Sequence, residues 1–264
     1  MDRDEARALM IGLLGEQLMK FPLRWCKPAF FGIEPAPGEQ VEVQNGTASL
    51  IVRGEDHFAI TCRHVLDGFR AVRAESDRGF FHIGNCAIDP LAQLVIEGQR
   101  DLDVAVLWLT PEQAQHIVRD SDGIGESFFR VDQDRPAIIE EGNGVAFAGF
   151  PGALRRHDAP QELNFGSYGC GATPVTSAND ARFICQFERA EWVVRAVEAE
   201  PATIGGLSGG PAFLIKQSPA GLITYEFAGI IYEYSNDYEL LYIVQAAAIF
   251  DLMHGGEPLP PSER

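Results

Sequence analysis

Beyond residue 30, short apolar runs alternate with clusters of glycine, proline, asparagine and aspartate. The runs are rich in valine, isoleucine and phenylalanine, and this spacing is typical of β-sandwiches and β-barrels. A first group covers residues 46–53, 57–62, 80–88, 91–97 and 103–109. A second group covers residues 144–150, 164–176, 182–188, 191–197, 211–216, 224–234 and 240–245. The pattern predicts an all-β protein with two lobes joined near residue 125.

Helical patterns occur mainly outside these groups. Near the N-terminus the apolar positions have helical spacing, which predicts an amphipathic helix packed on the body or on a partner. These positions are Ala6, Met10, Leu13, Leu14, Leu18 and Phe21. A proline begins a short helix over 111–120, and an apolar helix is expected over 246–253. The N-terminal stretch is acidic and lacks a small-residue cleavage site, so we do not expect it to be a signal peptide.

These elements suggest how the chain is divided. We expect an N-terminal helical extension over 1–30 and a first β-barrel over 31–125. A second barrel with the C-terminal helix is expected over 126–254, followed by a disordered, proline-rich tail over 255–264. No apolar run reaches the length of a transmembrane helix, so no membrane partner is expected.

Composition and charge narrow the classes of function. The 264 residues carry a formal net charge of −17 and no basic cluster, which argues against a nucleic-acid partner. The five cysteines are widely spaced and form no CxxC pair, so neither a disulfide framework nor a metal site is expected, and no cofactor is predicted. A reducing, cytoplasmic location fits this use of cysteine.

Two short motifs in the first half place a histidine and a carboxylate at strand ends. His64 follows an apolar strand in TCRHVLDGF and precedes what we expect to be one helical turn. Asp103 stands directly before the apolar strand of DLDVAVLWL, where partial desolvation suits a carboxylate that holds an imidazole. Asp101 is the nearby alternative. Each motif alone is more often structural than catalytic, and the DxD spacing has no matching metal ligands elsewhere.

The third motif, IGGLSGGPAF at 204–213, surrounds one serine with glycines. The glycines allow positive φ and leave the Ser208 hydroxyl uncrowded. The amides of Gly206 and Ser208 are then able to point at one spot and form an oxyanion hole. The motif therefore predicts a nucleophilic serine that lies beside its own oxyanion hole.

Together, GLSGGP, TCRHV and DLDVAVL resemble the motifs of the trypsin-like serine peptidases, in the same chain order of His, Asp and Ser. The resemblance covers roughly residues 46–250 and implies two antiparallel, Greek-key, six-stranded β-barrels of the chymotrypsin type, with the site in the cleft between them. It implies a serine endopeptidase in which Ser208 attacks the carbonyl, His64 transfers the proton and Asp103 holds the imidazole. The turn GFPG at 149–152 is similar to one that opens the second barrel in disulfide-free members.

Two departures from the family pattern are informative. Leu207 replaces the aspartate that pairs with a new N-terminus after zymogen cleavage, so activation by that route is not expected. Cys62 has no disulfide partner beside His64. Both features favour a disulfide-free, HtrA-like or stand-alone bacterial branch, here expected without a PDZ domain. A regulatory partner, or the N-terminal helix, is hypothesised to reshape the loop at Gly205 and Gly206; unchanged activity after deletion of residues 1–25 would count against this.

The resemblance also implies a substrate pocket. Its base would be formed by Ala202, Thr203 and Ile204, without the aspartate that selects Lys or Arg. A substrate-pairing strand would contribute Tyr232, Glu233 and Tyr234. The bulk of Tyr234 predicts a shallow pocket for small or medium apolar side chains of a protein or peptide substrate.

Two other readings remain open. The GLSGG run also fits the G-x-S-x-G nucleophile elbow of α/β-hydrolases, but that fold needs its acid and histidine after the serine, and the chain lacks alternating helices. Alternatively, the fold is a latent or inactive protease-like module that binds peptides at a strand edge. A flipped peptide at Gly206 would remove one oxyanion donor without changing any residue, which the sequence cannot reveal.

Overall fold

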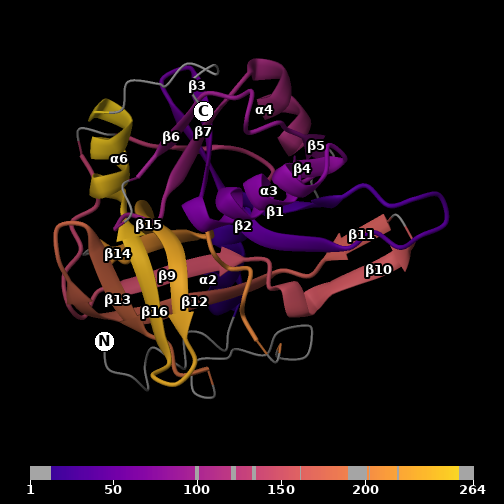
Figure 1. Cartoon of the computed structure of the whole chain (residues 1–264). Coiled ribbons are helices and arrows are strands. Elements are labelled where there is room, and N and C mark those ends of the chain that lie inside the picture. The colour runs from indigo at the N-terminus through magenta and orange to yellow at the C-terminus, as the bar shows by residue number, and fades with distance from the viewer. Residues whose placement is uncertain are drawn as a thin grey trace.

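The strands of this chain form two lobes. The computed structural model describes residues 13–98, 101–119, 123–132, 135–160, 162–189, 201, 203–218 and 220–255. In Figure 1 the strands of the N-terminal half, in indigo and magenta, lie above those of the C-terminal half, in orange and yellow. This mostly β architecture with helices at both ends agrees with the two-lobed fold that the hydrophobic pattern predicts.

The first lobe is one curled sheet of eight strands, in the order β5-β4-β1-β2-β3-β7-β6 with β8 beside β2. The strands are β1 (Cys26–Ile33), β2 (Val43–Arg53), β3 (Asp56–Thr61), β4 (Gly79–Ile83), β5 (Cys86–Ala87), β6 (Val95–Glu97), β7 (Ala105–Leu109) and β8 (Phe129–Arg130). All neighbours are antiparallel except β2 and β8. Helices α3 (Arg63–Glu75) and α4 (Pro111–Val118) complete the lobe.

The expectation of a closed six-stranded barrel is wrong for this lobe. Within the described residues, no strand pairing joins the end strands β5 and β6, which have only two and three residues. Helix α4 packs on β5, and helix α6 (Ala246–Gly255) packs on β6. The end strands are too short to close the sheet, and the helices lie beside them instead.

The second lobe is a closed six-stranded barrel, in the order β12-β13-β16-β15-β14-β9, which agrees with the prediction. Its strands are β9 (Gly144–Gly149), β12 (Tyr168–Ala178), β13 (Arg182–Gln186), β14 (Pro211–Gln217), β15 (Ile223–Ser235) and β16 (Leu240–Gln245). The strand predicted over 191–197 lies outside the described residues. A separate hairpin, β10 (Arg155–Ala159) with β11 (Glu162–Phe165), projects from the barrel beside the β1–β2 connection (Figure 1).

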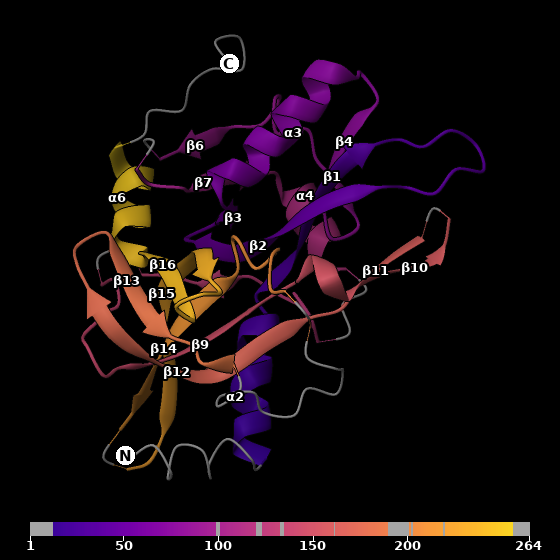
Figure 2. The same cartoon turned by 60° about the horizontal axis from the view of Figure 1, so that its bottom comes forward.

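The described part of the predicted N-terminal helix agrees with the helical spacing of Leu13, Leu14, Leu18 and Phe21; Ala6 and Met10 lie outside the described residues. Helix α2 covers Leu13–Leu23, and strand β1 begins at Cys26. After the helix, β1 pairs with β2 and β4. Figure 2 shows α2 beneath β9 and β12, and the Phe21 ring stacks on Tyr225 with centroids 3.6 Å apart.

Helix α3 is the element that the strand pattern missed. A single turn was expected after His64, but the helix runs for 13 residues. Val65, Leu66 and Phe69 are its buried residues, and they form one face toward the sheet. Helix α4 agrees closely with the predicted 111–120 helix. Its N-terminus has a capping box between Thr110 and Gln113.

Replacing Gly68 by alanine is expected to destabilise the first lobe. A Cβ at this helix position would lie 2.5 Å from Phe31 Cζ, and the Phe31 ring is buried and stacked on Phe81. Alanine gains about 0.5–1 kcal/mol in a helix interior. Overpacking a core costs about 1–3 kcal/mol, so we expect a net loss of about 1 kcal/mol in urea unfolding. An unchanged or raised midpoint would show that the Phe31 ring moves aside freely.

Within the described residues, no helix has both the length and the apolar character needed to cross a membrane.

The two lobes share apolar packing. Ile249, Phe250 and Met253 of α6 belong to the same buried cluster as the core of the first lobe. The junction between the lobes is therefore part of the packed interior, and it supports the residues described next.

Candidate active site

His64 and Asp103 lie together in the folded chain. His64 is the second residue of α3, and its Nδ1 atom lies 2.5 Å from Oδ2 of Asp103. The His64 backbone N–H donates to Oδ1 of the same carboxylate at 3.0 Å. Asp103 precedes β7, in a turn where the Val104 N–H donates to the Leu102 carbonyl. Two contacts from one residue therefore fix the carboxylate against the helix that carries the imidazole.

The electrostatics of this pair favour an ionised carboxylate. Burial alone would raise the pKa of Asp103, but the hydrogen bonds from the side chain and backbone of His64 outweigh it and hold that pKa below its ordinary value. The carboxylate accepts a hydrogen bond from the Nδ1–H group of His64. In this tautomer Nε2 carries no proton and is the acceptor nitrogen of the ring. The His64 side chain is 52% exposed, so Nε2 is accessible to a reactant. Asp101, the alternative carboxylate, is exposed.

Ser208 lies in a compact turn, residues 204–210, which we call the nucleophile turn. The Leu207 N–H donates to the Ile204 carbonyl at 3.3 Å, and the Gly210 N–H donates to the Leu207 carbonyl at 2.7 Å. Gly206 and Gly209 have φ of +106° and +91°, values that strain any residue with a Cβ. The glycines around Ser208 are therefore required by the path of the backbone.

Both lobes hold the nucleophile turn. The Thr47 N–H of β2 donates to the Ser208 carbonyl at 2.8 Å, and the Gly209 N–H donates to the Ile231 carbonyl of β15 at 2.7 Å. A Cβ at Gly209 would lie 2.9 Å from the Cα of Thr61, three residues before His64. Ser208 is thus built into the junction that also carries His64. Within the described residues, no hydrogen bond joins the Ser208 and His64 side chains.

The carbonyls on both sides of Gly206 are held from outside the turn. The Gly152 N–H donates to the Gly205 carbonyl, and the Thr47 hydroxyl donates to the Gly206 carbonyl, each at 2.8 Å. In a trans peptide the C=O and N–H point in opposite directions, so the bond from Gly152 directs the Gly206 N–H away from Gly152. In the described part of the chain, neither the Gly206 nor the Ser208 N–H has an acceptor. Two free donors, two residues apart, suit the binding of an oxyanion.

The residues that were predicted to form the base of the substrate pocket differ in their exposure to solvent. Ala202 lies outside the described residues. Thr203 is exposed, while Ile204 is buried in the barrel core with Tyr234 packed against that core. The Tyr234 hydroxyl donates to the Phe187 carbonyl at 3.4 Å, so its ring is fixed. This arrangement fills the space near Ile204 with apolar side chains.

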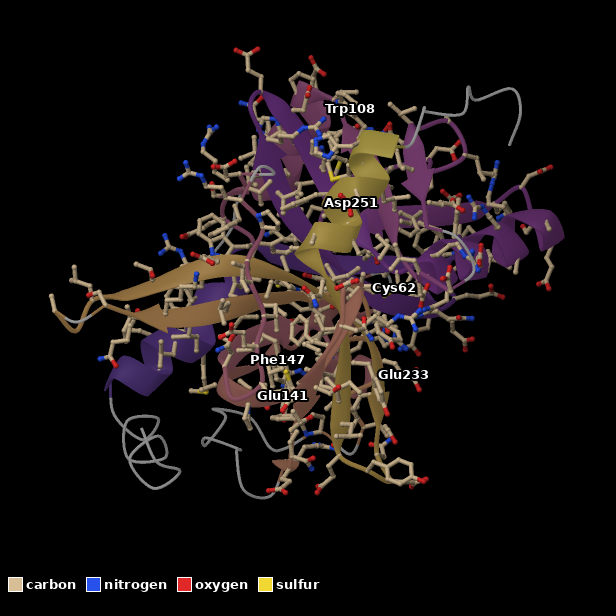
Figure 3. The ribbon with its side chains drawn as sticks, turned by 90° about the vertical axis from the view of Figure 1, so that its left-hand side faces the viewer. Cys62, Trp108, Glu141, Phe147, Glu233 and Asp251 are labelled. Atoms are coloured by element: carbon tan, nitrogen blue, oxygen red, sulfur yellow. The ribbon has the colours of Figure 1, made fainter. Side chains whose placement is uncertain are left out.

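Tyr232 and Glu233 lie at a bulge in β15. The register with β16 shifts between Ile231 and Glu233, which leaves Tyr232 as the extra residue. The Arg182 guanidinium lies over the Tyr232 ring, with its Cζ atom 5.2 Å from the ring centroid. Glu233 is exposed, and Figure 3 shows it on the lower lobe, below Cys62 at the junction of the lobes.

One group of possible metal ligands overlaps the site. Within the described residues, the ligand atoms of Cys62, His64 and Asp103 lie within 4.8 Å of one another. However, burial and the nearby Asp103 charge raise the pKa of the Cys62 thiol well above its ordinary value. The thiol donates to the Ile231 carbonyl at 3.2 Å. Because metal binding requires the thiolate, the arrangement favours proton transfer over metal coordination.

The Rv3671c protease from M. tuberculosis, solved in its active form, is similar over 94% of this chain and 89% of its own, with a TM-score of 0.51 and 16% identity. This chain shares the fold of that protease. The likeness agrees with the chymotrypsin-like fold that the motifs implied, and at this identity it bears on fold alone.

Two further solved structures are less similar. A serine endoprotease from Yersinia pestis is 13% identical with a TM-score of 0.45, over 89% of this chain and 64% of its own. The tobacco etch virus protease, solved with its product, is 11% identical with a TM-score of 0.45, over 90% of this chain and 80% of its own. No protein-family model and no curated protein matches the sequence. The HtrA-like assignment therefore stays a prediction.

Sequence reasoning missed the residues that hold the nucleophile turn. Thr47 lies in the apolar strand predicted over 46–53, where threonine is a common β-strand residue. Gly152 belongs to the GFPG turn at 149–152, and no hydrogen bond to the nucleophile turn was predicted for it. Both act through contacts with residues more than fifty positions away. No local spacing signals such contacts, so only the fold could identify these two residues.

Proposed function

We propose that this chain is a serine endopeptidase. The observation that carries the proposal is the ionised Asp103 bound to His64, beside a turn whose Gly206 and Ser208 amides have no acceptor among the described residues. These are the general base, its orienting carboxylate and the oxyanion donors that acyl transfer needs. The fold shared with the M. tuberculosis protease is compatible with this chemistry.

The first half of the reaction forms an acyl-enzyme. The Ser208 Oγ attacks the scissile carbonyl while His64 Nε2 takes the hydroxyl proton. The carbonyl electron pair moves onto oxygen, and the resulting oxyanion binds the N–H groups of Gly206 and Ser208. Asp103 stabilises the imidazolium without taking its proton. His64 then protonates the leaving amine, the C–N bond breaks, and the acyl group stays on Ser208.

The second half hydrolyses the ester. A water enters where the amine has left, and His64 Nε2 takes its proton as the water oxygen attacks the acyl carbon. The oxyanion forms again in the same hole and collapses as the ester bond breaks. His64 returns the proton to Ser208 Oγ, and the acid product leaves. The same four groups therefore serve both halves.

We further propose that the substrate backbone pairs with the edge at 232–234 and that the pocket prefers small or medium apolar side chains. The fixed Tyr234 ring and the buried Ile204 support this, because both fill space that a long side chain would need. Glu233 is the one exposed carboxylate of this edge. A peptide library with strong preference for Lys or Arg would overturn the pocket assignment and point to Glu233. Cytoplasmic location and control by a partner are part of the same proposal.

Labelling with a fluorophosphonate probe tests the reaction. We expect the wild type to be labelled, and Ser208→Ala and His64→Ala to be unlabelled, because the probe reacts with an activated serine and forms an oxyanion-like adduct. Circular dichroism shows whether each variant is folded. A folded wild type that takes up no probe would contradict the proposal and favour the latent, peptide-binding module.

A further inference from the structure

Thr47 has an unusual position at the centre of the site. It lies on β2, its side chain is fully buried, and its N–H holds the Ser208 carbonyl. Its hydroxyl donates to the Gly206 carbonyl at 2.8 Å and accepts the Phe150 N–H at 3.1 Å. Its own carbonyl accepts the Thr61 hydroxyl at 2.8 Å. All three polar groups of Thr47 are therefore engaged with the site or its supports.

The hydroxyl connects three separate parts of the chain. It belongs to the first lobe, it holds the nucleophile turn, and it accepts from Phe150 at the end of β9. Phe150 is also held by Asn45, whose side-chain N–H donates to the Phe150 carbonyl at 2.7 Å. A side chain without a hydroxyl would leave the Gly206 carbonyl and the Phe150 N–H without this partner. The direct result would be loss of one of the two restraints that flank Gly206.

Restraint matters here because Gly206 is intrinsically free to rotate. A glycine at positive φ has no Cβ to limit its flanking peptides. The oxyanion donor works only if its N–H is aimed before the charge develops. The carbonyl of Gly205 is held by Gly152, and the carbonyl of Gly206 by Thr47. Each bond fixes one of the two peptide planes that meet at the Gly206 Cα.

We propose that the Thr47 hydroxyl is a positioning group that holds the peptide plane after Gly206 and so limits the rotation that would turn the oxyanion-binding N–H of Gly206 away. This inference rests on the proposed function for its catalytic consequence, although the positioning itself is a property of the fold. Thr47 touches no reacting atom. Its contribution is expected in transition-state stabilisation and not in the binding of substrate.

The test compares Thr47→Val with Thr47→Ser on a peptide substrate. Valine keeps the shape and removes the hydroxyl, whereas serine keeps it. A lost oxyanion donor costs about 100-fold to 1,000-fold, and a misaimed one should cost less, so we expect kcat to fall about 10-fold to 100-fold in Thr47→Val with KM changed by less than about threefold. Affinity for a peptide aldehyde, which forms an oxyanion on Ser208, should fall by the same factor. Thr47→Ser should stay within about threefold of the wild type.

Thr173→Val is the matched control. Thr173 is as buried as Thr47, and its hydroxyl donates to the Gln186 carbonyl at 2.6 Å. It lies opposite Val145, at the far end of β9 from Phe150. We expect Thr173→Val to lower thermal stability to a similar degree while leaving kcat unchanged. A similar loss of kcat in both variants would reduce the effect of Thr47 to general destabilisation and overturn the inference.

A second readout separates this inference from the proposed function. In ¹⁵N-labelled protein, the Gly206 amide signal should shift in Thr47→Val and stay in place in Thr47→Ser and Thr173→Val. If the wild type takes up no fluorophosphonate, the proposed function fails, but the amide signals still decide whether Thr47 positions Gly206. An unshifted signal with unchanged kcat would overturn the inference alone. If Thr47→Val does not fold, Thr47→Cys replaces it, because a thiol is a weak donor of similar size; full activity with an unshifted signal would then be the contrary result.

Discussion

Replacing Asp103 by asparagine is expected to lower kcat about 10⁴-fold, because the same change in a Ser-His-Asp triad leaves the geometry intact but stabilises the wrong imidazole tautomer. Asp103 accepts both the Nδ1 proton and the backbone N–H of His64. Asparagine has one acceptor oxygen, and its NH₂ group is a donor. With the oxygen on the backbone N–H, the NH₂ faces Nδ1 and favours the tautomer that carries its proton on Nε2. That nitrogen is then unable to accept the Ser208 proton.

Initial rates on the best peptide substrate would measure this loss, and fluorophosphonate labelling should slow in parallel. Asp101→Asn is the matched control, since it makes the same chemical change two residues away at an exposed carboxylate. We expect it to stay within about twofold of the wild type, as surface substitutions generally do. A folded Asp103→Asn enzyme with kcat within tenfold of the wild type would remove Asp103 from the mechanism. An equal loss in Asp101→Asn would point to an effect of the loop.

The second large effect is expected for Gly152→Pro, which replaces the N–H that holds the Gly205 carbonyl by a ring Cδ that does not donate and that pushes this oxygen away. Without that bond the peptide between Gly205 and Gly206 is free to turn over, and the Gly206 donor is lost. Loss of one oxyanion donor lowers kcat by about 100-fold to 1,000-fold. The backbone conformation at this position suits proline, because Gly152 begins a short 3₁₀ helix and Pro151 before it is extended, with ψ of 135°.

Gly152→Ala provides the control, because alanine keeps the N–H. A Cβ here would meet Asn45 Oδ1 at 3.2 Å and the Gly205 carbonyl oxygen at 3.7 Å, so the cost in packing is small. We expect nearly normal kcat in the alanine variant and unchanged KM in both variants. Equal activity of the proline and alanine variants, with both folded, would show that the Gly205 carbonyl needs no donor. A Gly152→Pro enzyme with normal kcat but raised KM would place Gly152 in substrate binding.

The proposed catalytic residues were accessible to sequence reasoning because each one lies in a local motif. Ser208 stands among glycines that the turn requires, and Asp103 stands at the mouth of an apolar strand. His64 follows an apolar strand. The structure places His64 with Asp103 and builds Ser208 into the same junction, although the roles of these residues stay proposals. A site that depends on the local backbone conformation can therefore be predicted from a short sequence motif.

Other features depend on contacts between segments that are distant in the sequence, and no short motif predicts them. The open edge of the first lobe results from the shortness of β5 and β6 and from the packing of α4 and α6 beside them. Helix α3 was underestimated although Val65, Leu66 and Phe69 have helical spacing. The length of α3 could have been predicted from this local spacing, whereas the open edge of the first lobe needed the tertiary structure.

The place of α6 has a consequence for how the protein is made. Ile249, Phe250 and Met253 complete the apolar core around strands that leave the ribosome more than a hundred residues earlier. Until α6 emerges, the lobe that carries His64 and Asp103 lacks part of its interior. Ser208 is also translated after the whole of that lobe. A nascent chain therefore holds the proposed reacting groups on a finished scaffold only after both Ser208 and α6 have emerged.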